Sequence, residues 1–162
     1  MVPDTAQKLG ALLQQQIQNA EQLKQILQNE TDALITRDLG AIQHLSQEKS
    51  EQSSTLEKLS QPQQQLLQAA GLPYTAEGMK RFIESQPSNW AIPLRKQQLH
   101  LQTLLESCQK QNLINGNIIT ANRYSAETAL TILRGQFMPD NLVYSADGKA
   151  ATSSSSTSLI KA

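Results

Sequence analysis

Residues 101–133 read LQTLLESCQKQNLINGNIITANRYSAETALTIL, and the spacing within this stretch decides the fold. Its seam positions alternate in steps of four and three residues, as in a helix that packs along one face. Those positions are Leu101, Leu105, Cys108, Asn112, Asn115, Ile119, Asn122, Ala126, Ala129 and Leu133. The spacing continues through Asn115-Gly116, although an Asn-Gly pair is typical of turns. We therefore predict a single helix over about residues 89–134.

Two further long helices are predicted before this one. Apolar residues at helical spacing mark residues 4–36, and again residues 39–67, where residues 47–54 form a polar middle. Asp38 suits the N-cap of the second helix, and the short gap makes the two helices antiparallel neighbours, with one continuous helix as the alternative. Pro62 should kink the second helix or begin a new segment, and Gly71 should end it.

A connector over residues 72–92 joins the second and third long helices. Residues 75–85 fit a short helix that presents Met79, Phe82 and Ile83. After Gly135 serine and threonine dominate and no apolar period continues, which predicts a flexible C-terminal tail.

The predicted fold class is all-α. We expect an elongated, coiled-coil-like hairpin or bundle of three long helices with one short connector helix. Residues 1–135 form the predicted helical domain, and residues 136–162 form the tail.

Composition excludes several classes of function. The net charge is zero and aromatic residues make up 4% of the chain, so neither a basic field nor a stacking surface indicates nucleic-acid binding. No apolar stretch approaches the length of a transmembrane helix, and the N-terminus has no signal-peptide pattern. The single cysteine allows no intramolecular disulfide. These features predict a cytoplasmic protein with no integral membrane segment.

Catalytic and metal-binding patterns are missing from the sequence. His44 and His100 lie far apart and outside any cluster with metal-ligand spacing, so we expect surface positions for both. Cys108 lies on the predicted seam, where a buried small hydrophobe is the expected role and a nucleophile is the alternative. We predict no catalytic residue, no metal site and no cofactor, and hence no enzyme.

Polar residues interrupt the seam of the third helix at Asn112, Asn115 and Asn122. A buried amide costs free energy unless its hydrogen bonds are made. Two interpretations stay open: the asparagines fix the register of the protein's own helices, or they line a groove that a partner helix completes. In mid-helix, Gly116 costs about 1 kcal/mol relative to alanine. Its presence indicates either that another backbone approaches closely here or that the helix is able to loosen at this point.

Two motifs in this part of the chain resemble a known family. Residues 112–119, NLINGNII, followed by Ala129-Leu130 and Leu133, resemble the FlgN signature N-x-x-N-G-x-(I/L)-(I/L) with its downstream A-L-x-x-L. Residues 142–148, LVYSADG, resemble the family element L-Y-G-x-D-G, with Ser145 where the family often has glycine. The resemblance covers roughly residues 5–150.

The resemblance implies a flagellar type III export chaperone located in the cytoplasm at the base of the export apparatus. Such proteins bind the C-terminal amphipathic helices of the hook–filament junction proteins FlgK and FlgL, prevent their premature self-association and deliver them to the export gate protein FlhA. The family's client-binding region maps here onto a groove of Asn115, Ile118, Ile119, Asn122, Ala126, Leu130 and Leu133. Gate docking maps onto Tyr144, Asp147 and Gly148.

Two other functions fit the same helical pattern. The chain could serve a different export substrate, or it could be a structural coiled-coil protein whose seams pair with copies of itself. Weak self-association and folding of the tail back onto the client groove also stay open at this stage.

Overall fold

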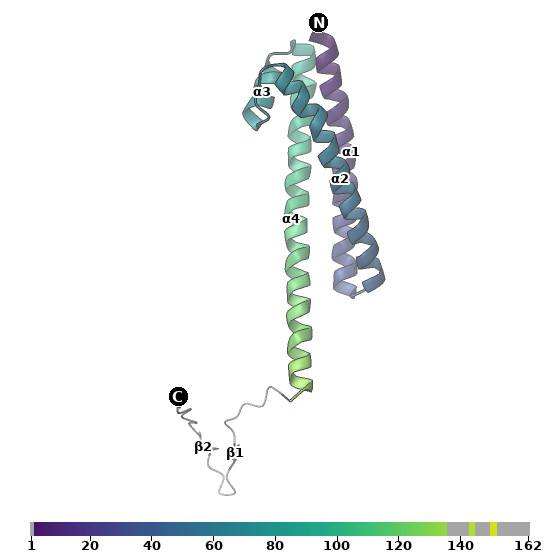
Figure 1. Ribbon diagram of the computed structural model, residues 1–162, viewed down its shortest axis with the longest axis vertical. Coiled ribbons are helices and arrows are strands. Elements are labelled where there is room, and N and C mark those ends of the chain that lie inside the picture. Colours follow the sequence, from purple (N-terminus) through teal and green to yellow (C-terminus); the bar gives the residue numbers. More distant parts are fainter. Residues whose placement is uncertain (1, 136–142, 145–149, 152–162) are drawn as a thin grey trace, which may run out of the picture. The chain divides into compact units, whose positions relative to one another are not determined.

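The computed structural model describes residues 2–135, 143–144 and 150–151 (Figure 1). The four helices in these residues are α1 (Val2–Thr36), α2 (Leu39–Ala69), α3 (Ala76–Glu84) and α4 (Ser88–Leu133). Two short strands, β1 (Val143–Tyr144) and β2 (Ala150–Ala151), pair antiparallel. The predicted all-α class is confirmed. The chain divides into two compact units, Met1–Thr120 and Ala121–Ala162.

A tight turn separates α1 from α2. Arg37 adopts a left-handed backbone conformation (φ 56°), which reverses the chain immediately after α1. Asp38 then caps α2, because its Oδ1 accepts a hydrogen bond of 3.0 Å from the backbone N–H of Ala41. The predicted cap and the separation into two helices are therefore confirmed.

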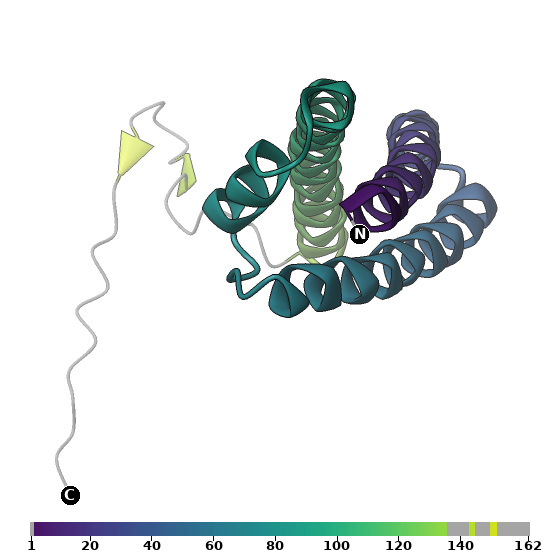
Figure 2. The ribbon, with the colours of Figure 1, turned by 90° about the horizontal axis from the view of Figure 1, so that it is seen from above.

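Helix α2 continues through Pro62 and ends where Gly71 was predicted to end it. The helix is continuous across the proline, and Figure 2 shows it curving along its length. Gly71 is left-handed (φ 71°), and the backbone N–H groups of Gly71 and Leu72 bond to the carbonyls of Gln68 and Leu67, both at 2.9 Å. This pair of bonds is the Schellman motif, which satisfies carbonyls at the end of a helix.

Helix α3 is the predicted connector helix. Thr75 caps it by accepting a 3.0 Å hydrogen bond from the backbone N–H of Gly78, and Met79, Phe82 and Ile83 are buried. Glycine is required at position 78, because a Cβ there would lie 1.9 Å from the carbonyl oxygen of Pro73.

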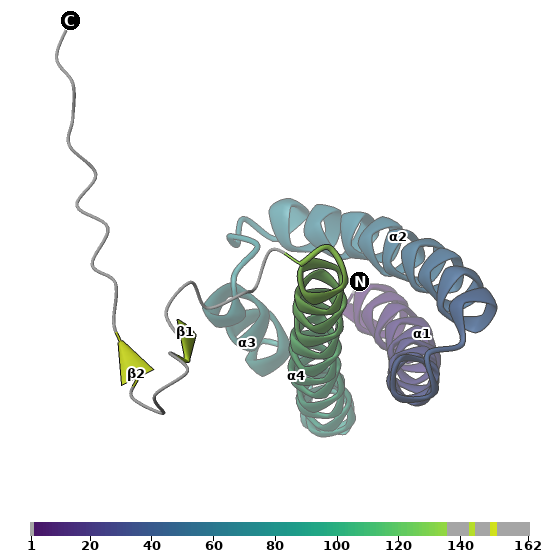
Figure 3. The ribbon, with the colours of Figure 1, turned by 90° about the horizontal axis from the view of Figure 1, so that it is seen from below.

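The core of the Met1–Thr120 unit follows α1, which lies beside both α2 and α4 (Figure 3). Its larger cluster joins all four helices, and its most deeply buried large side chains include Leu9, Leu13, Leu67 and Leu94. A smaller cluster of Leu23, Leu27 and Cys108 continues the packing between α1 and α4.

The predicted seam of α4 is correct only in part, and its positions at Ala126, Ala129 and Leu133 are exposed. The helix spans Asn115-Gly116 as expected, and Leu101, Cys108 and Asn115 are buried. The intermediate seam positions, however, lie one residue earlier: Leu104 is buried and Gln111 and Ile118 are half-buried, whereas Leu105, Asn112 and Ile119 are exposed. At Leu104-Leu105 and Ile118-Ile119 two apolar residues stand side by side, so the apolar spacing allowed either choice.

Candidate partner-binding surface

The last part of α4 carries apolar side chains on its surface. Before the boundary between the two units, Ile118 is half-buried and Ile119 is 46% exposed. After the boundary, Ala126 is exposed, Leu130 is 49% exposed and Leu133 is 82% exposed.

Helical geometry places these residues on one side of α4. Their steps of three and four residues keep them within one stripe of a helix with 3.6 residues per turn. We call Ile118, Ile119, Asn122, Ala126, Leu130 and Leu133 the terminal face of α4. The same side of the helix packs against α1 at Cys108, whose thiol lies 3.6 Å from the carbonyl oxygen of Ala20. The stripe that is core near Cys108 is therefore increasingly exposed toward the end of α4.

Asn115 belongs to the core rather than to the terminal face. It is 1% exposed, and its Nδ2 donates to the Leu27 carbonyl at 2.9 Å and to Glu30 Oε2 at 2.7 Å. Its Oδ1 accepts from Thr31 Oγ1 at 2.6 Å and from Gln111 Nε2 at 3.3 Å. The chain itself thus satisfies this amide, so the prediction that Asn115 lines an open groove does not fit this conformation, whereas the register-fixing interpretation does.

A partly buried ion pair extends this polar cluster to α2. Glu30 is buried, and its Oε1 accepts a 2.7 Å hydrogen bond from Lys49 Nζ. Lys49 also lies 3.4 Å from Oδ1 of Asn112 on α4. We call Glu30, Thr31, Lys49, Gln111, Asn112 and Asn115 the Asn115 network. The network connects α1, α2 and α4, because each of these helices contributes at least one of its residues.

Cys108 and the histidines occupy the positions expected of them. Cys108 is 4% exposed, and burial raises the pKa of its thiol although the charge of Lys24 opposes this effect. A buried thiol with a raised pKa is a poor nucleophile, which supports the predicted packing role. His44 and His100 are exposed and lie 3.6 Å from Glu48 and Glu21. Within the described residues no three metal-ligating side chains cluster.

The predicted gate-docking residues fall mostly outside the described structure. Tyr144 belongs to β1 and pairs with Ala150 across the short ladder. Asp147 and Gly148 lie outside the described residues.

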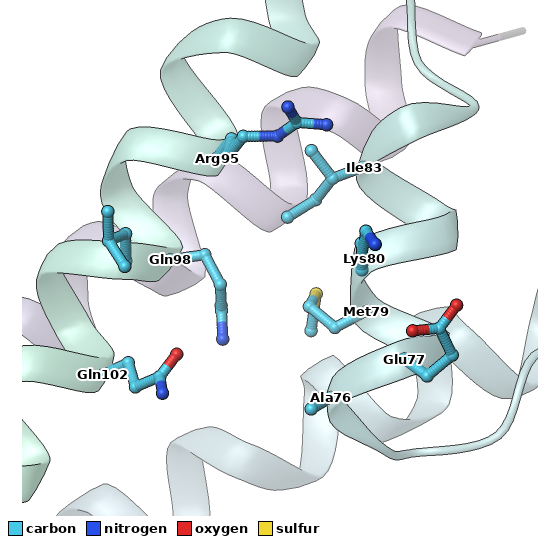
Figure 4. A pocket seen from close by; sticks show the side chains of 9 residues that line it. Ala76, Glu77, Met79, Lys80, Ile83, Arg95, Gln98 and Gln102 are labelled. Atoms are coloured by element: carbon cyan, nitrogen blue, oxygen red, sulfur yellow. The ribbon is translucent and has the colours of Figure 1, made fainter.

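Two hollows that the sequence did not predict lie between α3, α4 and the end of α2. The first, about 440 Å³, lies between α3 and α4 (Figure 4), and the second, about 480 Å³, also reaches α1 and α2. The sequence feature that indicates these hollows is glutamine at inward-facing helix positions. Gln16 in α1 and Gln63 in α2 are examples, and both are buried. Glutamine is so frequent in this chain that these two did not stand out.

These features define an all-α protein whose last long helix carries exposed apolar residues toward its end. None of the helices in the described residues has the length and apolarity needed to cross a membrane. The sequence model of the FlgN protein family matches residues 1–152, and the chain belongs to this family.

Comparison with solved structures supports the same assignment. The crystal structure of a putative flagella synthesis protein FlgN from Pseudomonas aeruginosa is similar to this chain, with 32% sequence identity and a TM-score of 0.61 over 76% of this chain and 93% of that one. No curated protein gave a significant match. Together, the family match and this structure support a flagellar export chaperone.

Proposed function

We propose that this protein is a cytoplasmic chaperone for FlgK and FlgL that binds their C-terminal amphipathic helices and delivers them to FlhA at the base of the flagellar export apparatus. Membership of the FlgN family supports the export role. The observation that carries client binding is the terminal face of α4, where Leu130 and Leu133 are exposed on the stripe that is core elsewhere in the helix.

The terminal face suits an amphipathic helix because of its spacing and its chemistry. Apolar residues at steps of three and four can interdigitate with the apolar stripe of a second helix. Burial of a leucine side chain stabilises a complex by about 2 kcal/mol, so two leucines and an isoleucine supply a substantial share of the binding free energy. Asn122, between the apolar residues, would fix the register of the bound helix.

The proposal is tested by placing charge on the terminal face. Leu130→Asp combined with Leu133→Asp should weaken binding of purified FlgK and FlgL at least about tenfold in isothermal titration calorimetry, because two carboxylates would be desolvated in the complex. Both side chains are exposed, so the fold should persist, which circular dichroism can check.

A matched control uses the opposite side of the same helix. Tyr124 is exposed and points away from the terminal face by helical geometry, so Tyr124→Asp should leave client affinity unchanged. Equal losses in both variants, or none in the double variant, would show that clients do not bind at this face.

A further inference from the structure

The two hollows beside α3 form one groove within the Met1–Thr120 unit. They share the lining residues Ala76, Met79, Gln98 and Gln102, so one hollow continues into the other. Figure 4 shows the part between α3 and α4, with Gln98 and Gln102 reaching across from α4 toward Met79. We call the combined space the glutamine groove.

The larger hollow combines an apolar lining with many amides. Leu56 from α2, Met79 from α3, and Leu101 and Leu105 from α4 supply the apolar part. The amides come from three helices and belong to Gln16, Gln63, Gln98, Gln102 and Gln109. Such a lining favours a ligand that is apolar over most of its contact area and carries a few polar groups.

Two amide oxygens in this lining are buried without a hydrogen-bond donor. Gln16 is 5% exposed, and its Nε2 donates to Gln63 Oε1 at 3.3 Å. Its own Oε1 has no donor in the described part of the chain, and neither has Oε1 of Gln98. A buried carbonyl oxygen without a donor is unfavourable, and a ligand that brings N–H groups would remove this cost.

The charge of the larger hollow points to a cationic donor. Its lining contains one carboxylate, Glu106, and neither lysine nor arginine, whereas the smaller hollow is lined by Glu77, Lys80 and Arg95. Glu106 Oε1 accepts a 2.9 Å hydrogen bond from Gln102, which leaves Oε2 able to accept another. Amide oxygens together with a carboxylate match the ammonium of lysine or the guanidinium of arginine.

We propose that the glutamine groove seats an amphipathic helix of the export client, with a lysine or arginine beside Glu106, polar N–H donors on Gln16 and Gln98, and apolar neighbours on Leu105 and Met79. This inference rests on the proposed chaperone function and adds a second client site, separate from the terminal face of α4. A helix in the groove would bury Leu105, which is exposed in the isolated chain, and would supply the missing donors.

Removal of the acceptors tests the groove. Gln98→Met keeps the side-chain length without the amide, and Gln16→Met does the same at the more buried position. Each should weaken binding of purified FlgK or FlgL about tenfold by calorimetry. Thermal unfolding of Gln98→Met should stay at or above that of the unaltered protein, because an unmatched carbonyl is lost, whereas the Gln16 variant also loses its 3.3 Å hydrogen bond to Gln63 and needs circular dichroism as a check of folding. Gln97→Met is the matched control, since Gln97 lines neither hollow and its Nε2 lies 3.4 Å from Gln14 Oε1.

Reversal of the single charge tests the identity of the donor. Glu106→Lys should weaken client binding more than Glu106→Gln, and the difference should shrink at high salt because the added repulsion is screened. An unchanged affinity in Glu106→Lys would overturn the basic-helix assignment.

The outcomes separate this inference from the proposed function. Unchanged binding in the Gln16, Gln98 and Glu106 variants, together with a loss in Leu130→Asp/Leu133→Asp, would overturn the glutamine groove and leave the chaperone function intact. Absence of binding between the unaltered protein and either client would overturn both.

Discussion

The carboxamide of Asn115 can donate two hydrogen bonds and accept two, and its surroundings use all four. Three of the four partners lie on α1, and one of them, Glu30, is a buried carboxylate that also pairs with Lys49 of α2. One amide therefore sets how α4 is aligned along α1 and indirectly along α2. A shift of α4 by one residue would leave several buried polar groups without partners.

Truncation of Asn115 should reveal this dependence. Asn115→Ala leaves the Leu27 carbonyl and one oxygen of Glu30 without their shortest contacts, so we expect a loss of about 2 kcal/mol in the free energy of unfolding. Urea denaturation measures it. Asn112→Ala is the control, because Asn112 is exposed and lies 3.4 Å from Lys49, and it should cost less than about 0.5 kcal/mol. Similar losses for the two asparagines would contradict a special role for Asn115.

At the scale of helices and turns, local chemistry in the sequence specified most of the fold. Asp38 and Gly71 act at the ends predicted for them, because caps and left-handed glycines depend on near neighbours only. The register of α4 depends instead on contacts with α1. Spacing could not choose between Leu104 and Leu105, and the packed structure buries Leu104.

The candidate site was less predictable for the same reason. The exposed positions Ile119, Leu130 and Leu133 lie on the predicted side of α4, but the sequence gives no measure of how far α1 covers that side. Asn115 is buried because its partners come from α1, at a sequence separation of more than 80 residues. The glutamine groove likewise depends on how α2, α3 and α4 come together.

Two helix glycines should respond in opposite ways to the same substitution. Gly116→Ala should stabilise the protein by about 0.5–1 kcal/mol, because nothing lies within 4 Å of a Cβ at this position and alanine is the better helix former. Gly78→Ala should destabilise it by about 2 kcal/mol or more, since its Cβ would meet the Pro73 carbonyl and displace α3 from the core. Urea denaturation of both variants is the measurement, and a stabilised Gly78→Ala would contradict the α3 packing.

Gly116 also bears on partner binding. The open space around it excludes close approach of a backbone from within the described chain, which was one of the two interpretations offered by the sequence. Under the proposed function, two explanations of the glycine remain. Either Gly116 allows α4 to loosen next to the Asn115 network, or the backbone of a client approaches it closely. Calorimetry of client binding to Gly116→Ala distinguishes them, because only close approach by the client should cost affinity.

At the scale of the whole molecule, the proposed functions lie on different segments of one neutral chain. The glutamine groove involves α1 to α4 within Met1–Thr120, the terminal face of α4 begins at Ile118, and the proposed gate residue Tyr144 lies in β1. A net charge of zero provides no long-range attraction for an oppositely charged partner, so recognition should depend on contacts at these segments.

Separate segments predict separable defects. Tyr144→Ala should weaken docking of the chaperone–client complex on the cytoplasmic part of FlhA by about tenfold and leave the affinity for FlgK and FlgL unchanged, because an aromatic anchor is lost from one interface only. Leu130→Asp/Leu133→Asp should show the reverse pattern when the chaperone alone is tested against FlhA. Calorimetry with each partner gives both affinities. A loss of client binding in Tyr144→Ala as large as the loss of gate docking would mean that the segment around β1 takes part in holding the client.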